Sequence, residues 1–96
     1  MPSIVFTQYL RPDGRTRQVT VERPLGIVVA ADRITRLGFV FEIEMLDAET
    51  VSMSVGNGEE DLCGLVCSNG IEVPKQVDKL VRLAAKELRL HVSDEK

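Results

Sequence analysis

Five basic side chains near the C-terminus have the spacing of one helix face, with steps of four, three, four and three residues. At about 100° per residue they fall within an arc of roughly 80°. Apolar residues such as Val77, Leu80 and Ala84 fall on the opposite side, which predicts an amphipathic helix. We call the cationic side the basic ridge; its members are Lys75, Lys79, Arg82, Lys86 and Arg89. The ridge could bind an acidic protein or a phosphate backbone, or it could be only a solvated helix face.

The soft metal ligands of the chain are Cys63, Cys67 and His91. A zinc site normally needs four tetrahedral ligands, and this chain offers a single cysteine pair inside an expected strand. A cysteine nucleophile needs a base within reach, and His91 falls where the last helix is expected to fray. We therefore predict no catalytic residue, no metal site and no cofactor site.

Glu42 and Glu44 alternate along one side of another expected strand. Paired carboxylates can perform acid–base chemistry when burial separates their pKa values. The flanking sequence does not predict such burial, so a solvated sheet face is the favoured interpretation. We do not expect an enzyme.

The spacing of the two cysteines also bears on their oxidation state. Four residues of strand span about 13 Å, whereas a disulfide needs Cα atoms within about 7 Å. We expect Cys63 and Cys67 to be buried, reduced thiols, which are typical of a reducing compartment. The N-terminus lacks a secretory signal, and no apolar run approaches the roughly 18 residues of a membrane span. These features predict a cytoplasmic location and no membrane partner.

The order of expected elements is β-β-α-β-β-β-α within one domain, residues 1–96. A β-hairpin over 1–22 turns at Arg11-Pro12-Asp13-Gly14-Arg15, which has the residues of a tight turn. A helix over 24–37 follows, then a three-stranded meander over 39–68 and a C-terminal helix over 74–91. Short turns favour antiparallel pairing, and each helix has one apolar face. We predict an α+β fold with an antiparallel five-stranded sheet and both helices packed on one face.

The charge of the chain is unevenly distributed, although its net value is only -3. Residues 1–38 carry a net charge of +3, residues 39–71 carry -7 and no base, and residues 72–96 carry +1. A pI near 5.1 is unlike the basic pI of a dedicated nucleic-acid-binding domain. The order α-β-β-β-α from Pro24 to Leu90 is nevertheless that of double-stranded-RNA-binding domains, an analogy of topology alone.

Two sequence blocks carry a resemblance: residues 6–15, FTQYLRPDGR, and residues 67–74, CSNGIEVP. With Arg23-Pro24 and Phe41-Glu42, they resemble a group of small bacterial proteins of unknown function, some of them associated with prophages. The resemblance implies no activity. The sequence as a whole predicts a small non-enzymatic accessory or protein-interaction domain that could also self-associate. The alternative is nucleic-acid binding through the basic ridge.

Overall fold

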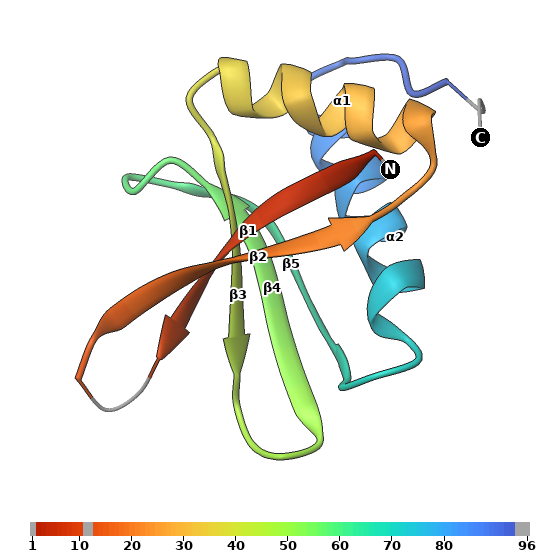
Figure 1. Ribbon diagram of the computed structural model, residues 1–96. Helices are drawn as coiled ribbons and strands as arrows, with labels where there is room; N and C mark the ends of the chain where they lie inside the picture. The colour runs from red at the N-terminus through yellow and green to blue at the C-terminus, as the bar shows by residue number, and fades with distance from the viewer. Residues whose placement is uncertain (1, 11–12, 94–96) are drawn as a thin grey trace.

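The computed structural model describes residues 2–10 and 13–93 and has the predicted order of elements in an α+β fold (Figure 1). The strands are β1 (Ser3–Leu10), β2 (Arg15–Glu22), β3 (Val40–Met45), β4 (Thr50–Gly56) and β5 (Asp61–Ser68). The helices are α1 (Leu25–Arg36) and α2 (Val73–Glu87). No helix in the described ranges is long and apolar enough to cross a membrane.

Strands β1 and β2 form an antiparallel hairpin that runs in register from Ser3↔Glu22 to Leu10↔Arg15. At its tip Gly14 has a φ of +74°, a conformation that glycine adopts without steric cost. The backbone N–H of Arg15 donates to Oδ1 of Asp13 over 3.3 Å, as turn-forming Asp residues commonly do. The other two predicted turn residues, Arg11 and Pro12, lie outside the described residues.

The sheet has the strand order β2-β1-β3-β4-β5, and β1 pairs with β3 in parallel. The prediction of a fully antiparallel sheet is therefore wrong. The cause is the connection between β2 and β3, which is a helix and not a short turn. Strand β2 ends beside the start of β1, and α1 returns the chain to that same end of the sheet. Consequently β3 starts where β1 starts and runs in the same direction. Their ladder has three register pairs, from Thr7↔Glu42 to Tyr9↔Glu44.

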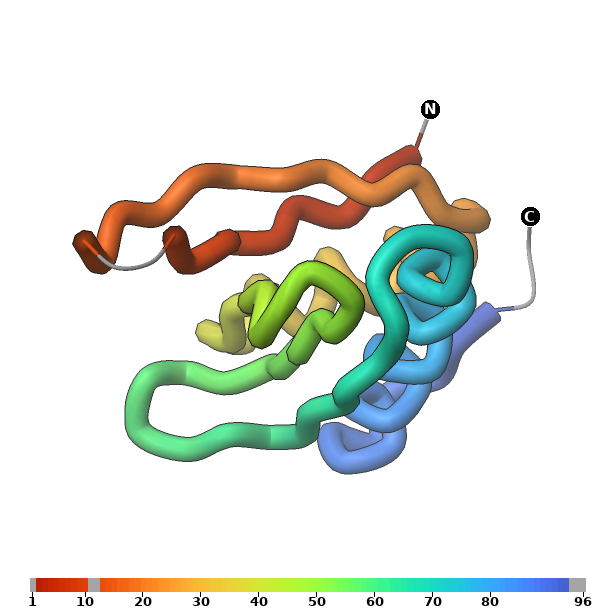
Figure 2. Tube along the Cα trace, turned by 90° about the horizontal axis from the view of Figure 1, so that it is seen from below, coloured from red at the N-terminus to blue at the C-terminus, as the bar shows by residue number. Residues whose placement is uncertain are grey.

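Both helices pack on one face of the sheet, as predicted. Helix α1 begins after Pro24, whose fixed φ suits a helix start, and it lies across one end of the sheet (Figure 1). Helix α2 packs against β5 and β4. Figure 2 shows the β1–β2 hairpin and β5 on opposite sides of the molecule, with α2 crossing between them.

The core lies between the helices and the inward side chains of the strands. The ring centroids of Phe6 and Phe41 lie 5.5 Å apart in an edge-to-face arrangement, which joins β1 to β3 across the short parallel ladder. The largest fully buried side chains are Phe6, Phe41, Ile34, Met53, Leu80, Val51, Val55, Val77 and Val81. The opposite sheet face is only half-buried or exposed, and it carries Val5, Thr7, Tyr9, Val40, Glu42, Glu44, Ser52 and Ser54.

Candidate functional site

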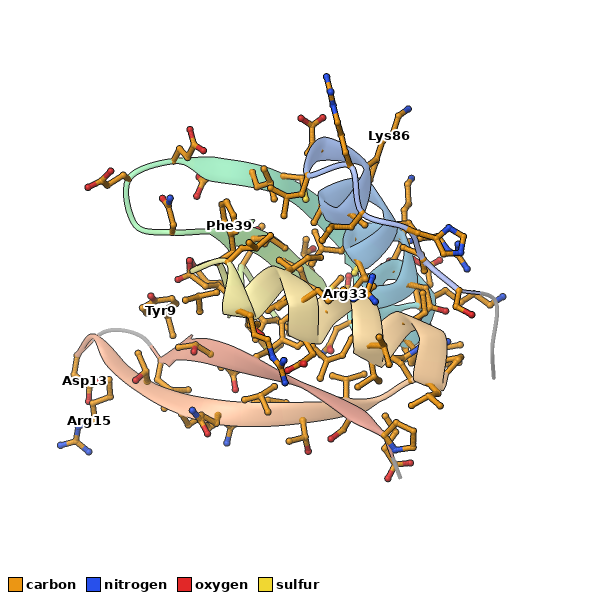
Figure 3. The ribbon with its side chains drawn as sticks, turned by 90° about the horizontal axis from the view of Figure 1, so that it is seen from above. Tyr9, Asp13, Arg15, Arg33, Phe39 and Lys86 are labelled. Atoms are coloured by element: carbon orange, nitrogen blue, oxygen red, sulfur yellow. The ribbon has the colours of Figure 1, made fainter. Side chains whose placement is uncertain are left out.

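All five members of the basic ridge are exposed in the structure. On the opposite side of α2, Val77, Leu80 and Ala84 are fully buried against the sheet. Burial of this apolar stripe fixes the rotation of the helix and turns the cations outward. Figure 3 shows the Lys86 side chain extending away from the sheet. The ridge residues within the helix thus share one surface, while the role of the ridge in binding stays a prediction.

Helix α2 ends at Glu87, four residues before the predicted end at residue 91. Arg89 adopts a φ of +57°, and two backbone bonds close the helix end. The N–H of Leu90 donates to the carbonyl of Ala85 over 2.8 Å, and the N–H of Arg89 donates to the carbonyl of Lys86 over 3.1 Å. This pattern is a Schellman motif, usually built on glycine. The reversal allows Leu90 to pack against the core. Four ridge residues therefore belong to the helix, and Arg89 extends the ridge from the turn that follows.

Arg23 and Asp78 form a two-bond ion pair that the sequence analysis did not find. Nε of Arg23 donates to Oδ1 of Asp78, and Nη2 donates to Oδ2, both over 2.6 Å. Their side chains are only 21% and 26% exposed. The hydrogen bonds to Asp78 raise the pKa of Arg23, against the opposing effect of burial. The pair joins the connection between β2 and α1 to the first half of α2. Because 55 positions separate the partners, no local pattern could reveal it.

Cys63 and Cys67 are free thiols on the helix-facing side of β5. Cys67 is buried, as predicted, whereas the prediction of burial is wrong for Cys63, which is only half-buried. Burial raises the pKa of both thiols, with smaller contributions from Glu87 at Cys63 and from Glu72 at Cys67. A raised pKa reduces the thiolate fraction, which is the nucleophilic form. His91 is exposed beyond α2, and the described residues contain no group of three His, Cys, Asp or Glu that could hold a metal ion.

Tyr9 and Glu42 interact on the open face of the sheet. Together with Glu44, Ser52 and Ser54 they line a shallow hollow of about 80 Å³. A hydrogen bond to Glu42 raises the pKa of Tyr9, followed by the negative charge of Glu42 and a small effect of burial. Glu42 thus accepts a hydrogen bond from the neutral phenol of Tyr9. This contact favours a structural role for Glu42 on the sheet surface over a role as a general base.

The Tyr9 contact predicts a titration that absorbance can follow, because Tyr9 is the single tyrosine and the chain has no tryptophan. We expect Tyr9 to ionise above the usual pKa of tyrosine, and Glu42→Gln to bring that pKa back toward the usual value. Since the folded-state pKa is raised, the contact stabilises the fold below the unfolded-state pKa of about 10, and this stabilisation is lost as the pH rises through the folded-state value.

The control for this titration is Glu49→Gln, which removes an exposed carboxylate from the β3–β4 turn. This variant should leave the ionisation of Tyr9 unchanged. An equal pKa of Tyr9 in the parent protein and in Glu42→Gln would show that the contact is absent in solution.

Larger hollows lie elsewhere on the surface formed by the described residues. One, of about 320 Å³, lies between the hairpin and the start of α2, and it is lined mainly by apolar residues such as Val21, Ile43 and Val73. In it, Nε of Arg17 donates to Oε1 of the buried Gln8 over 2.6 Å.

Another hollow, of about 520 Å³, lies along α1 and the start of β1, and neither it nor the 320 Å³ hollow is lined by a cysteine or a histidine. A further hollow of about 480 Å³ lies along β4 and the edge strand β5. Its lining includes Cys63, Gly64 and Val66 but no histidine.

The comparisons with known proteins identified no relative of this chain. The chain matches no protein-family model, no curated protein and no solved structure.

Proposed function

We propose that this chain is a small non-enzymatic interaction domain that binds an acidic protein segment through the basic ridge. The observation that carries the proposal is the exposure of four ridge cations on the side of α2 opposite its buried stripe, with the exposed Arg89 in the turn that follows. Long basic side chains on a fixed helix can reach several carboxylates of one partner. The cationic face would steer an acidic partner toward the helix and set its orientation.

The distribution of charge favours a protein partner over nucleic acid. The chain carries a net charge of -3, and its middle segment 39–71 carries -7. Glu42 and Glu44 project from the open sheet face, so that face would repel a phosphate backbone. Single-stranded nucleic acids usually stack on exposed aromatic rings, whereas Phe6 and Phe41 are buried and Tyr9 contacts Glu42.

The surroundings of the titratable groups support a non-enzymatic role. Burial raises the pKa of both thiols, which lowers the fraction present as the nucleophilic thiolate. The hollows of about 520, 320 and 480 Å³ contain no pairing of a cysteine nucleophile with a histidine base in their linings, although Cys63 lines the last of them. Binding through a convex helix surface needs no deep pocket, which agrees with the open hollows of this molecule.

Charge reversal on the ridge tests the proposal. Lys79→Glu combined with Lys86→Glu should weaken binding to a fluorescent peptide rich in Glu and Asp by about tenfold or more. Two exposed ion pairs contribute up to about 1 kcal/mol each, and 1.4 kcal/mol corresponds to tenfold. Fluorescence anisotropy at low salt gives the affinity, which should fall at 1 M salt, where screening shortens to about 3 Å.

The matched control reverses two exposed arginines away from the ridge, Arg15→Glu with Arg33→Glu, and makes the same change in net charge. It should bind the peptide with an affinity close to that of the parent protein. Equal loss in both variants would show that only net charge matters and would refute a ridge-specific site. Tighter binding to duplex RNA than to the peptide, with a log–log salt slope near -0.9 per phosphate, would instead favour the nucleic-acid alternative.

A further inference from the structure

The two outer edges of the sheet differ in chemical character. Strand β2 forms one edge and carries the exposed charges Arg15, Arg17 and Glu22. Strand β5 forms the other edge, and in the part of the chain that the structure describes it has a strand neighbour only in β4. Its eight residues contain no proline and a single charge, Asp61, at the first position. Edge strands that must stay unpaired are commonly protected by charges, proline or bulges. A register irregularity lies at the start of β5, where Cys63 pairs with Val55 but Asp61 pairs with Gly56, and the rest of the strand, residues 63–68, lacks this protection.

Gly64 and Val66 lie side by side along β5 on the open face of the sheet. Val66 is 65% exposed. Nothing within the chain demands glycine at position 64: its φ is not positive, and an added Cβ would meet Met53 O and Ser54 Cβ at 3.4 and 3.8 Å. A glycine inside a strand often marks a site where another chain approaches closely. A partner side chain can occupy the space over Gly64.

We propose that β5 pairs antiparallel with β5 of a second copy, about a two-fold axis at Leu65, to form a continuous ten-stranded sheet. In this register Leu65 faces its own counterpart, and the exposed Val66 of each copy covers Gly64 of the other. Paired residues keep their side chains on the same face, as the pleat requires. The regular part of the strand, residues 63–68, carries no charge, so no like charges meet within it.

The occupant is a second copy because β5 complements itself in this register. The projecting Val66 and the bare Gly64 are two positions apart, so one two-fold rotation places each against the other in both copies. A register centred on Gly64 would instead leave two glycines opposed and would place Asp61 against the buried Cys67. The proposal deepens the interaction role inferred above but uses a different surface, so either proposal can fail alone.

Disulfide formation between the two copies would reveal the register in which their β5 strands pair. Centring the pair on Leu65 places Cys63 of one copy opposite Cys67 of the other, with Cα atoms about 4.5–5.5 Å apart, within the range of a disulfide. Within one chain the same two residues are four strand positions apart and cannot bridge. Diamide, which accepts two electrons and two protons for each disulfide formed, should therefore convert the parent protein into a covalent dimer.

Single-cysteine variants give the decisive experiment. Cys63→Ser alone and Cys67→Ser alone should each remain monomeric on a non-reducing gel after diamide treatment. An equal mixture of the two should form a covalent heterodimer, because it supplies one Cys63 and one Cys67 across the interface. Cross-linking within either single variant, or none in the mixture, would overturn the Leu65-centred register.

Sedimentation equilibrium tests the association independently of the cysteines. The parent protein should be dimeric, and Val66→Lys should be monomeric with an unchanged far-UV circular dichroism spectrum. Val40→Lys, at a similarly apolar and exposed position on β3, should stay dimeric. The ridge variant Lys79→Glu/Lys86→Glu should also stay dimeric, while Val66→Lys should still bind the acidic peptide. A parent protein that is monomeric at all concentrations, or a dimeric Val66→Lys, would overturn the proposal.

Discussion

Replacing Leu80 by alanine is expected to lower the free energy of unfolding by about 2–5 kcal/mol. Leu80 is fully buried in the middle of α2. Its backbone carbonyl also accepts a weak hydrogen bond from Sγ of Cys63 over 3.8 Å, which places this turn of the helix against β5. The truncation removes buried apolar surface and leaves a cavity that the rigid sheet fills only partly.

Urea denaturation followed by far-UV circular dichroism measures the loss. The control is Ile71→Ala, which removes a side chain that is 93% exposed and should change the free energy of unfolding by no more than about 0.5 kcal/mol. All variants should be compared at one protein concentration, because the proposed self-association would make the apparent stability depend on concentration. A cost below about 0.5 kcal/mol for Leu80→Ala would mean that α2 presents a different face to the core.

Periodicity and turn chemistry are local properties, and they predicted the parts of this fold that depend on local sequence. The alternation of Phe41, Ile43 and Met45 indicated one inward side of β3. The spacing of Val77, Leu80 and Ala84 set the rotation of α2, and with it the exposure of the ridge. Asp13 and Gly14 marked the hairpin turn. In each case the residues that make up the sequence pattern also form the structural feature that the pattern predicts.

Strand order and the end of α2 depend on contacts between distant segments, and there the sequence analysis failed. The parallel pairing of β1 with β3 follows from where α1 returns the chain, which periodicity does not encode. The helix pattern continues through Arg89, and its arginine gives no stop signal of the kind that glycine gives. The helix ends because Leu90 packs against the core when Arg89 adopts a positive φ.

The candidate site likewise combines features that follow from local sequence with contacts between residues far apart in the chain. The ridge could be predicted from spacing alone, since four of its five members lie on one helix. The ion pair of Arg23 with Asp78 and the contact of Tyr9 with Glu42 join residues from different elements. The edge position of Gly64 and the space around it depend on the strand order, which local sequence patterns do not encode.

A double-mutant cycle on Arg23 and Asp78 is expected to give a coupling energy of about 1–2 kcal/mol. The value should exceed the roughly 0.2–1 kcal/mol of exposed pairs, because two charge-assisted bonds form between side chains that are about three-quarters buried. Partial exposure keeps it below the full contribution of hydrogen bonds to charged groups. Urea unfolding of Arg23→Ala, Asp78→Ala and the double variant supplies the four free energies.

The internal comparison is the pair Arg36–Asp32 on α1, whose side chains are 79% and 55% exposed with 3.0 Å between Nε and Oδ2. A double-mutant cycle on this pair should give a coupling energy of only about 0.3–0.5 kcal/mol, as for other ion pairs four residues apart on a helix. Arg23→Lys should lose much of the Arg23 coupling, since an ammonium group cannot form the two parallel bonds of a guanidinium. If both cycles give the same small value, the ion pair does not hold α2 against the start of α1, and apolar packing alone fixes the position of the helix that carries the ridge.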